Sequence, residues 1–288
     1  MKSDKSNSIE ELTTAVYPDK ILSAFGKPGL FITGTNTDIG KTTVTAALAG
    51  AFHRLNIRVG VCKAIASGCP KNPSRGNGKD FTDDDLLSPD AVLAATMAGL
   101  DPLNEEIMRV ISPIRFAAPV SPHVAARIEN REPDWKRLAY AMNYWRGACD
   151  FLLVEGAGGW LVPLNRRLFT IADLAQTLAL PTVVVTGAYL GTLNHTSLTV
   201  ESIRARNIPV AGLVANRVPI ERDISIQSSL DELPHIMHTP MLAVLPQDSQ
   251  VTLTHVPGNF VDALEPFARQ WWKDVGKTRT QELGVRRL

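Results

Sequence analysis

The sequence predicts a single α/β domain with a mostly parallel sheet and helices on both faces. Two observations support this fold class. Apolar segments alternate with helical patterns, and the apolar segments show little polar alternation, as expected of strands covered on both faces. The predicted strands are residues 29–33, 59–63, 151–155, 182–186, 210–215 and 241–245. Because ligands of such sheets bind beyond the carboxyl ends of the strands, the residues that follow each strand are the candidates for function.

Helical patterns fill the segments between these strands. Ser88-Pro89 and Ser121-Pro122 each offer an N-cap followed by proline in the first helical position, which predicts two helix starts. Further helices are expected at residues 42–55, 134–148, 171–180, 192–206 and 260–272, and a loop at residues 70–85. We interpret residues 1–28 as a partly disordered N-terminal extension with a short helix at 9–16, residues 29–276 as the domain and residues 277–288 as a C-terminal tail.

Charge and cysteine content exclude several classes of function. Of the 288 residues, 20% are charged and the net charge is +1, so neither a nucleic-acid partner nor a membrane surface is expected. The cysteines Cys62, Cys69 and Cys149 are too few and too widely spaced for a disulfide framework or a CxxC metal site. No apolar segment approaches the roughly 20 residues needed to cross a bilayer, and the N-terminus lacks the apolar core of a signal peptide. A cytoplasmic enzyme is therefore expected.

A glycine-bounded loop between the first strand and the next helix predicts a phosphate-binding site. Residues 34–42 end in Gly-Lys-Thr, and the backbone N–H groups and helix dipole at such a position attract phosphates. Lys41 would reach the outer phosphates, and the Thr42 hydroxyl would bind Mg²⁺. Five residues, instead of the usual four, separate Gly34 from Gly40, and a surface turn is the alternative interpretation. The Gly-Lys-Thr ending favours a P-loop NTPase-type domain that binds a nucleoside triphosphate.

Polar and small residues follow several other predicted strands. Lys63 ends the second strand; its alternative interpretation is a solvated strand-end lysine. Glu155 ends the third, where a carboxylate must be paired or bound to metal. The small residues 156–159 that follow it would let a ligand approach the backbone closely. Asn216 and Arg217 follow the fifth strand. These positions predict one site at the carboxyl edge of the sheet.

Several motifs, taken together and in order, resemble the dethiobiotin synthetase family. They are the elongated phosphate loop, Lys-Ala-Ile-Ala-Ser-Gly at residues 63–68, Ser-Pro-His at 121–123, the Val-Glu-Gly-Ala-Gly-Gly element within 154–163, and Val-Ala-Asn at 214–216. The resemblance implies an ATP- and Mg²⁺-dependent ligase of biotin biosynthesis. Such an enzyme converts 7,8-diaminononanoate and CO₂ (or bicarbonate) to dethiobiotin through a carbamate and a carbamic-phosphoric anhydride, with release of ADP and phosphate.

The resemblance also implies residue roles. The catalytic residues would be Lys63, Lys41 and Thr37, and the metal ligands Thr42, Asp90 and Glu155. Nucleotide binding would involve Asp38, Ile39, Gly40, Lys41, Thr42, Thr43, Asp90, Glu155, Gly156, Ala157, Gly158, Asn216, Arg217, Pro246, Gln247 and Asp248, with Asn216 at the adenine edge. Substrate would contact Ser67, Gly158, Gly191, Thr192, Leu193 and Asn194. The last four would come from the partner subunit of a homodimer whose active site is shared across the interface.

Some of these assignments have alternatives. The helix dipole alone would favour an acidic residue at Asp90, in the first turn of a helix. Asp83, Asp84 and Asp85 compete with it for the metal, because the loop before Asp90 is longer than expected. Ser67 and Asn216 are also residue types that are common in turns.

The sequence departs from the family pattern at five positions, two of which lie in the phosphate loop: Asn36 replaces an acidic residue, and Asp38 stands where a glutamate is common. Ala64 replaces the usual proline, Arg217 stands where an acidic residue is expected, and Gln247 is less bulky than expected. The changes at Ala64 and Arg217 would fit a non-catalytic homologue.

A partitioning-type P-loop ATPase that acts through protein or DNA binding is the alternative function. It shares the strand–loop–helix core, but the sequence has neither a basic stripe nor a membrane-binding terminal helix. It would also leave Lys63, Ser67 and Glu155 without a role.

Overall fold

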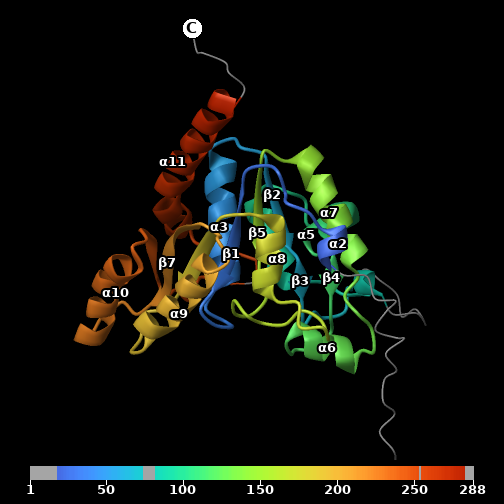
Figure 1. Ribbon diagram of the computed structural model, residues 1–288, viewed down its shortest axis with the longest axis horizontal. Coiled ribbons are helices and arrows are strands. Elements are labelled where there is room, and N and C mark those ends of the chain that lie inside the picture. Colours follow the sequence, from blue (N-terminus) through green and yellow to red (C-terminus); the bar gives the residue numbers. More distant parts are fainter. Residues whose placement is uncertain (1–17, 74–81, 253, 283–288) are drawn as a thin grey trace, which may run out of the picture.

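A six-stranded sheet forms the centre of the molecule, and all of its strands run parallel (Figure 1). The computed structural model describes residues 18–73, 82–252 and 254–282. In spatial order the strands are β2 (Val59–Lys63), β5 (Phe151–Glu155), β1 (Gly29–Gly34), β6 (Thr182–Thr186), β7 (Val210–Val218) and β8 (Met241–Pro246). The predicted fold class is confirmed, and each of the six strands lies where its apolar segment predicted it.

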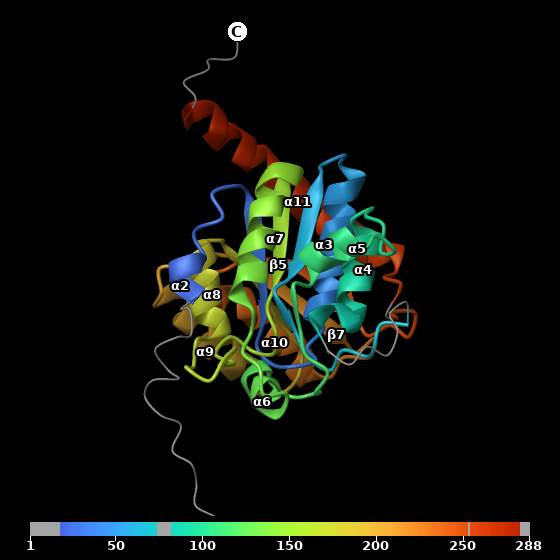
Figure 2. The same cartoon turned by 90° about the vertical axis from the view of Figure 1, so that its right-hand side faces the viewer.

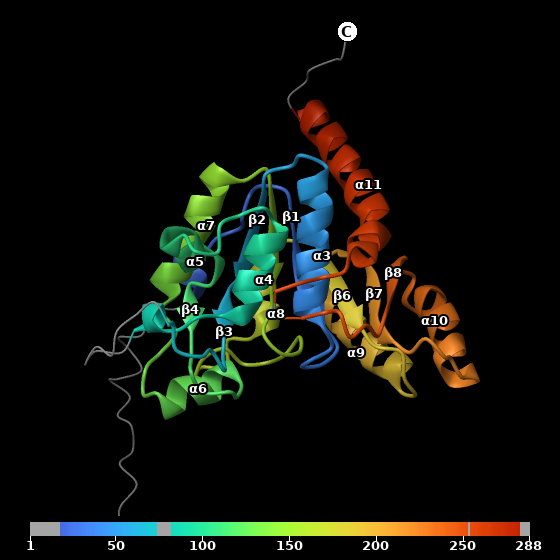
Figure 3. The same cartoon turned by 180° about the vertical axis from the view of Figure 1, so that it is seen from behind.

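Helices cover both faces of this sheet. Figures 2 and 3 show α3 (Lys41–Arg54), α4 (Pro89–Met97) and α11 (Gly258–Glu282) on one face, and Figure 2 shows α8 (Ile171–Leu178) and α9 (Thr192–Arg204) on the other. The helix α7 (Trp135–Ala148) contacts the edge strand β2. Every residue of β1, β2, β5 and β6 is buried. Coverage on both faces explains why these strands lack polar alternation.

The sequence did not predict several short or peripheral elements. They are α2 (Pro18–Ile21), η1 (Asp83–Asp85), α5 (Glu105–Ile111), α10 (Ile224–Met237) and a second sheet that pairs β3 (Ile65–Ala66) with β4 (Ile114–Arg115). The helix α6 (Pro122–Ile128) begins at the predicted Ser121-Pro122, although the Ser121 side chain makes no capping hydrogen bond. The second sheet lies beside the predicted site and becomes important below.

The domain boundaries that we expected fall within packed or helical segments. Leu22 and Phe25, assigned to the N-terminal extension, are buried in the core, and Phe25 N–H donates to the Leu178 carbonyl at 2.9 Å. The Arg146 side chain donates to the Phe25 carbonyl at 3.1 Å. At the other end, α11 continues to Glu282, past the predicted boundary at 276. The short helix expected at 9–16 lies outside the described residues.

The three cysteines are free thiols, and all three are buried. Burial raises the pKa of the Cys149 thiol to about 11 and that of Cys69 to about 12. Within the described ranges, no helix has both the length and the apolar character that a membrane span requires.

Trp145 on α7 is expected to be a major source of stability. Trp145 is 2% exposed. Its indole ring packs against Gly60, where an added Cβ would lie 2.7 Å from the ring. The indole Nε1–H donates to the Val110 carbonyl at 3.1 Å. Trp145→Ala should therefore lower the free energy of unfolding by about 3–5 kcal/mol, measured by urea denaturation. Tyr140→Ala, on the same helix at 58% exposure, is the control and should change it by about 0.5 kcal/mol or less. Equal losses in both variants would show that Trp145 has no special role.

Candidate active site

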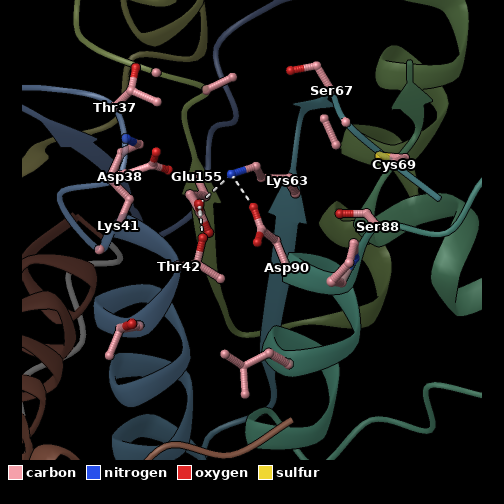
Figure 4. Close-up of a pocket in the computed structure, with 18 of the residues that line it drawn as sticks. Thr37, Asp38, Lys41, Thr42, Lys63, Ser67, Cys69, Ser88, Asp90 and Glu155 are labelled. Carbon is pink, nitrogen blue, oxygen red and sulfur yellow. Dashed lines mark hydrogen bonds and ion pairs between the residues drawn. The ribbon is translucent and has the colours of Figure 1, made fainter. Parts of the chain in front are cut away.

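A buried lysine between two carboxylates forms the centre of the site (Figure 4). Lys63 is the last residue of β2, and the strand register places it directly beside Glu155 of β5. Its Nζ lies 2.5 Å from Glu155 Oε1 and 2.8 Å from Asp90 Oδ2, in the first turn of α4. Three elements that are far apart in sequence therefore meet at one ammonium group.

These ion pairs set the protonation states of the group. Burial alone would lower the pKa of Lys63, but the charges of Glu155 and Asp90 outweigh it and raise the pKa above its ordinary value. Burial would raise the pKa of Asp90, yet the charge of Lys63 and its hydrogen bond hold that pKa below its usual range. Lys63 is thus charged at neutral pH and is only 8% exposed. The interpretation of Lys63 as a solvated strand-end residue is wrong.

The phosphate loop joins this group through its Thr42 hydroxyl, which donates to Glu155 Oε1 at 2.8 Å. Lys41 lies close by and is buried, and its Nζ donates to the Asn36 carbonyl at 3.1 Å. Burial and the neighbouring charge of Lys63 lower the pKa of Lys41 to about 8. An anionic ligand beside the Lys41 ammonium would favour its charged form and raise this pKa again.

Asn216, two residues before the end of β7, supports the phosphate loop. Its side chain is 2% exposed, and its Nδ2 donates to the Ile39 carbonyl at 3.1 Å. Gly40 has φ 91°, and a Cβ there would lie 1.8 Å from Asn216 Nδ2, so only glycine fits. The contact of Asn216 with the adenine edge stays a prediction, since the structure shows the amide bound to the loop.

A cavity of about 510 Å³ opens over these groups. The predicted residues that line it are Thr37, Asp38, Gly40, Lys41, Thr42, Thr43, Lys63, Ser67, Asp90, Glu155, Ala157, Gly158 and Arg217. They come from the carboxyl ends of the strands and the helices that follow, as expected for such a sheet.

Other predicted residues lie outside the lining of this cavity. They are Ile39, Gly156, Pro246, Gln247, Asp248, Gly191, Thr192, Leu193 and Asn194, together with Asn216. Gly156 packs against α8, where an added Cβ would lie 3.0 Å from the Ile171 side chain. Gln247 N–H donates to the Val218 carbonyl at 2.8 Å. The buried Thr192 hydroxyl donates to the Gly187 carbonyl at 2.8 Å. Their roles in binding stay predictions.

Part of the cavity lining consists of residues to which the sequence assigned no role in the site. The additional residues are Ile65, Ala66, Gly68, Cys69, Ser88, Pro89, Leu93, Val251 and Thr252. Gly68 and Cys69 adjoin Ser67, and Ser88-Pro89 is the predicted helix start, so their position next to predicted residues was the available signal. Nothing in the sequence marked Val251 or Thr252.

The acidic residues that compete with Asp90 have other partners. Asp83 lies 3.2 Å from Arg131 Nη1, and Asp84 lies 2.5 Å from Arg137 Nη2. The Asp85 carboxylate accepts from the backbone N–H of Thr82 at 2.7 Å. Of the four acidic residues, only Asp90 lines the cavity.

This arrangement suits the binding of a triphosphate together with a hard cation. Glycine-rich backbone and Lys41 face one part of the cavity, and two carboxylates with the Thr42 hydroxyl lie beside them. Lys63 adds a second fixed positive charge where phosphoryl charge could develop.

Comparison with known proteins identifies the family. The family described as "AAA domain" matches residues 28–254. The chain is 36% identical over 227 residues to "ATP-dependent dethiobiotin synthetase BioD" of Thermodesulfovibrio yellowstonii, covering 76% of this chain and 89% of that protein. It is 38% identical to the protein of the same name from Anaeromyxobacter dehalogenans, covering 77% and 92%, and 30% identical to that from Halalkalibacterium halodurans, covering 88% and 96%.

Solved structures of partitioning and cell-division ATPases are more distant. A ParA family ATPase from Chlorobium tepidum has a TM-score of 0.46 and 18% identity, with 85% of this chain and 98% of that chain covered. A similarity at that level carries no argument about function, whereas the family match and the curated relatives agree with the motifs of the site. The chain belongs to the ATP-dependent dethiobiotin synthetase family.

Proposed function

We propose that this protein is an ATP-dependent dethiobiotin synthetase, which closes a cyclic urea from 7,8-diaminononanoate and CO₂ with the use of ATP. The observation that carries the proposal is Lys63, fixed between Glu155 and Asp90 in the same cavity as the phosphate loop. A partitioning-type ATPase would have no use for this ion-paired lysine. The sequence resemblance and the curated relatives support the same activity.

The described residues suit phosphoryl transfer to a carbamate. In the proposed reaction a diamine nitrogen captures CO₂ as a carbamate, whose oxygen attacks the γ-phosphate; the second amine then displaces phosphate. Such transfers depend mainly on positioning and charge stabilisation. The phosphate loop and Lys41 would bind the triphosphate, while Lys63 would hold the carbamate and stabilise charge on the transferring group.

Magnesium fits the donor set of the site. Thr42, Asp90 and Glu155 offer a hydroxyl and two carboxylates, the hard oxygen ligands that this ion prefers, with room for water and phosphate oxygens. When bound, the ion neutralises phosphate charge. Asp83, Asp84 and Asp85 are not needed as metal ligands in this proposal, and each of them has another partner.

The start of α9 supports a homodimer. Gly191 and Asn194 are exposed, the neighbouring Leu190 is 87% exposed, and none of them lines the cavity of their own chain. The N–H groups of this helix start could bind the carboxylate of a substrate in a second copy. We therefore propose that two copies share each active site. Ser67 would help to hold the diamine, and the enzyme would act in the cytoplasm.

The activity is tested by substrate-dependent ATP turnover. ADP release should require 7,8-diaminononanoate and bicarbonate together, because the phosphoryl acceptor forms only from both. A coupled ADP assay measures the release, and mass spectrometry identifies the cyclic product. ADP release that ignores the diamine and rises with DNA would instead favour the partitioning ATPase.

Lys63→Met should lower the rate of turnover but strengthen the binding of a divalent cation. Turnover should fall about 100-fold or more because a fixed charge at the phosphoryl group is lost. Without the ammonium, Asp90 and Glu155 repel each other, so Mn²⁺ should raise the melting temperature of this variant by about 3 °C or more beyond its effect on wild type. Thermal unfolding measures that shift, and Lys136→Met, at an exposed position of α7, is the control. Equal Mn²⁺ shifts in all three proteins would contradict this metal site.

Lys41 should make ADP binding depend on pH. Its pKa is lowered from 10.5 to about 8 in the nucleotide-free protein, whereas bound phosphates favour the charged form. ADP binding should therefore take up a proton near about pH 8.5, and affinity should fall as the pH rises further. Calorimetry in buffers of different ionisation enthalpy measures the uptake. Lys41→Arg, which stays charged, should abolish it; proton release by wild type would refute this assignment.

A further inference from the structure

The small second sheet forms the part of the cavity wall that holds Ser67. Figure 4 shows Ser67 and Cys69 on the other side of Lys63 from Thr37 and Asp38. The lining residues here are Ala66, Ser67, Gly68 and Cys69, which end and follow β3. The position of this backbone therefore determines how Ser67 is presented to a ligand near Lys63.

The strand β4 and the residues after it hold this wall by backbone hydrogen bonds. Phe116 N–H donates to the Ala66 carbonyl at 2.8 Å, and Cys69 N–H donates to the Phe116 carbonyl at 2.9 Å. Gly68 N–H donates to the Ala118 carbonyl at 3.0 Å. A shift of residues 116–118 would thus move the wall with it.

The opposite edge of this segment is bound by two carboxylates in place of a further strand. Successive N–H groups of a strand point to opposite edges, so those of Arg115 and Ala117 point away from β3. Arg115 N–H donates to Asp83 Oδ1 at 2.6 Å, and Ala117 N–H donates to Glu129 Oε1 at 2.7 Å. Ala118 N–H also donates to Glu129 Oε1, at 3.0 Å. The backbone N–H groups along this edge therefore donate to side-chain carboxylates instead of to another strand.

Arg131 joins the two carboxylates. Its guanidinium lies 3.2 Å from Asp83 Oδ1 and 3.0 Å from Glu129 Oε2, and it donates to the Arg115 carbonyl on the same edge. Its Cζ lies 4.2 Å from the centre of the buried Phe116 ring, a cation–π contact. We call Asp83, Glu129 and Arg131 the edge clamp. The planar fork of arginine makes all these contacts at once, which lysine cannot do.

We propose that the edge clamp positions the diamine-binding wall, and that Arg131 is a positioning residue for the second substrate and not for the nucleotide. The inference rests on the proposed function. The clamp contacts residues 115–118, which hold the Ser67 wall, whereas the phosphate loop is built from β1 and α3 and is supported by Asn216. Loosening the clamp should therefore affect one substrate selectively.

Arg131→Met tests this with both substrates. The KM for the diamine should rise about tenfold, because small misplacements of a binding wall are costly. The KM for ATP and the Kd for ADP should stay within about twofold of wild type. Arg131→Lys, which keeps the charge between the two carboxylates but loses the fork, should show an intermediate KM for the diamine.

Arg137→Met is the matched control. Its side chain is 27% exposed, against 24% for Arg131, and it donates to the Pro113 carbonyl at 2.9 Å, just before β4. It pairs with Asp84, and within the described ranges no hydrogen bond or ion pair joins it to Asp83, Glu129 or Arg131. Arg137→Met should lower stability while the KM for the diamine stays within about twofold.

Distinct outcomes overturn the clamp and the proposed function. An active wild-type enzyme with an unchanged diamine KM in Arg131→Met, or equal rises in Arg131→Met and Arg137→Met, would overturn the clamp alone. Parallel rises in the diamine and ATP constants would do the same. If wild type shows no diamine-dependent ADP release, the proposed function fails and the clamp proposal fails with it. Should Arg131→Met not fold, Glu129→Ala removes the acceptor for Ala117 and Ala118 and carries the same expectation.

Discussion

The ion pairs of Lys63 are the constraint around which the site is built. A buried ammonium is unfavourable unless carboxylates and hydrogen bonds compensate it, and here Glu155 and Asp90 do so at 2.5 and 2.8 Å. The parallel register of β2 and β5 places Lys63 beside Glu155, and α4 begins where Asp90 can reach the same atom. Any change in that register would leave a charge unpaired in the core.

The two lysines of the cavity differ because their partners differ. Lys63 has two carboxylates, and its pKa is raised. The hydrogen bond of Lys41 goes to a neutral carbonyl, and burial next to Lys63 lowers its pKa. Environments that move two similar groups in opposite directions indicate a division of roles. The charged form of Lys41 would be stabilised by an anionic ligand, which is the role expected of the phosphate-loop lysine. Lys63 is already charged and fixed in place, so it can stabilise negative charge that develops during the reaction.

Local patterns predicted the sheet but not the contacts between distant segments. Continuous apolar segments located all six strands of the main sheet, and the strand-end rule located Lys63 and Glu155. The two-residue strands β3 and β4 are too short for a periodic pattern, and α10 contains Pro234, which argues against a helix. The hydrogen bond from Asn216 to Ile39 spans 177 positions, so no local pattern could have indicated that Asn216 supports the loop.

The choice among Asp83, Asp84, Asp85 and Asp90 shows why distant partners decide function. Sequence alone offers four similar carboxylates before and within one helix start. Arginines that follow later in the chain bind the first two, a local cap uses the third, and the Arg115 side chain donates to the Leu86 carbonyl at 2.6 Å. These contacts occupy Asp83, Asp84 and Asp85, and of the four carboxylates only Asp90 lines the cavity and pairs with Lys63. The edge clamp and the lysine ion pairs are thus two separate sets of contacts at one cavity: the clamp holds residues 115–118 behind Ser67, and the ion pairs hold the charges beside the phosphate loop.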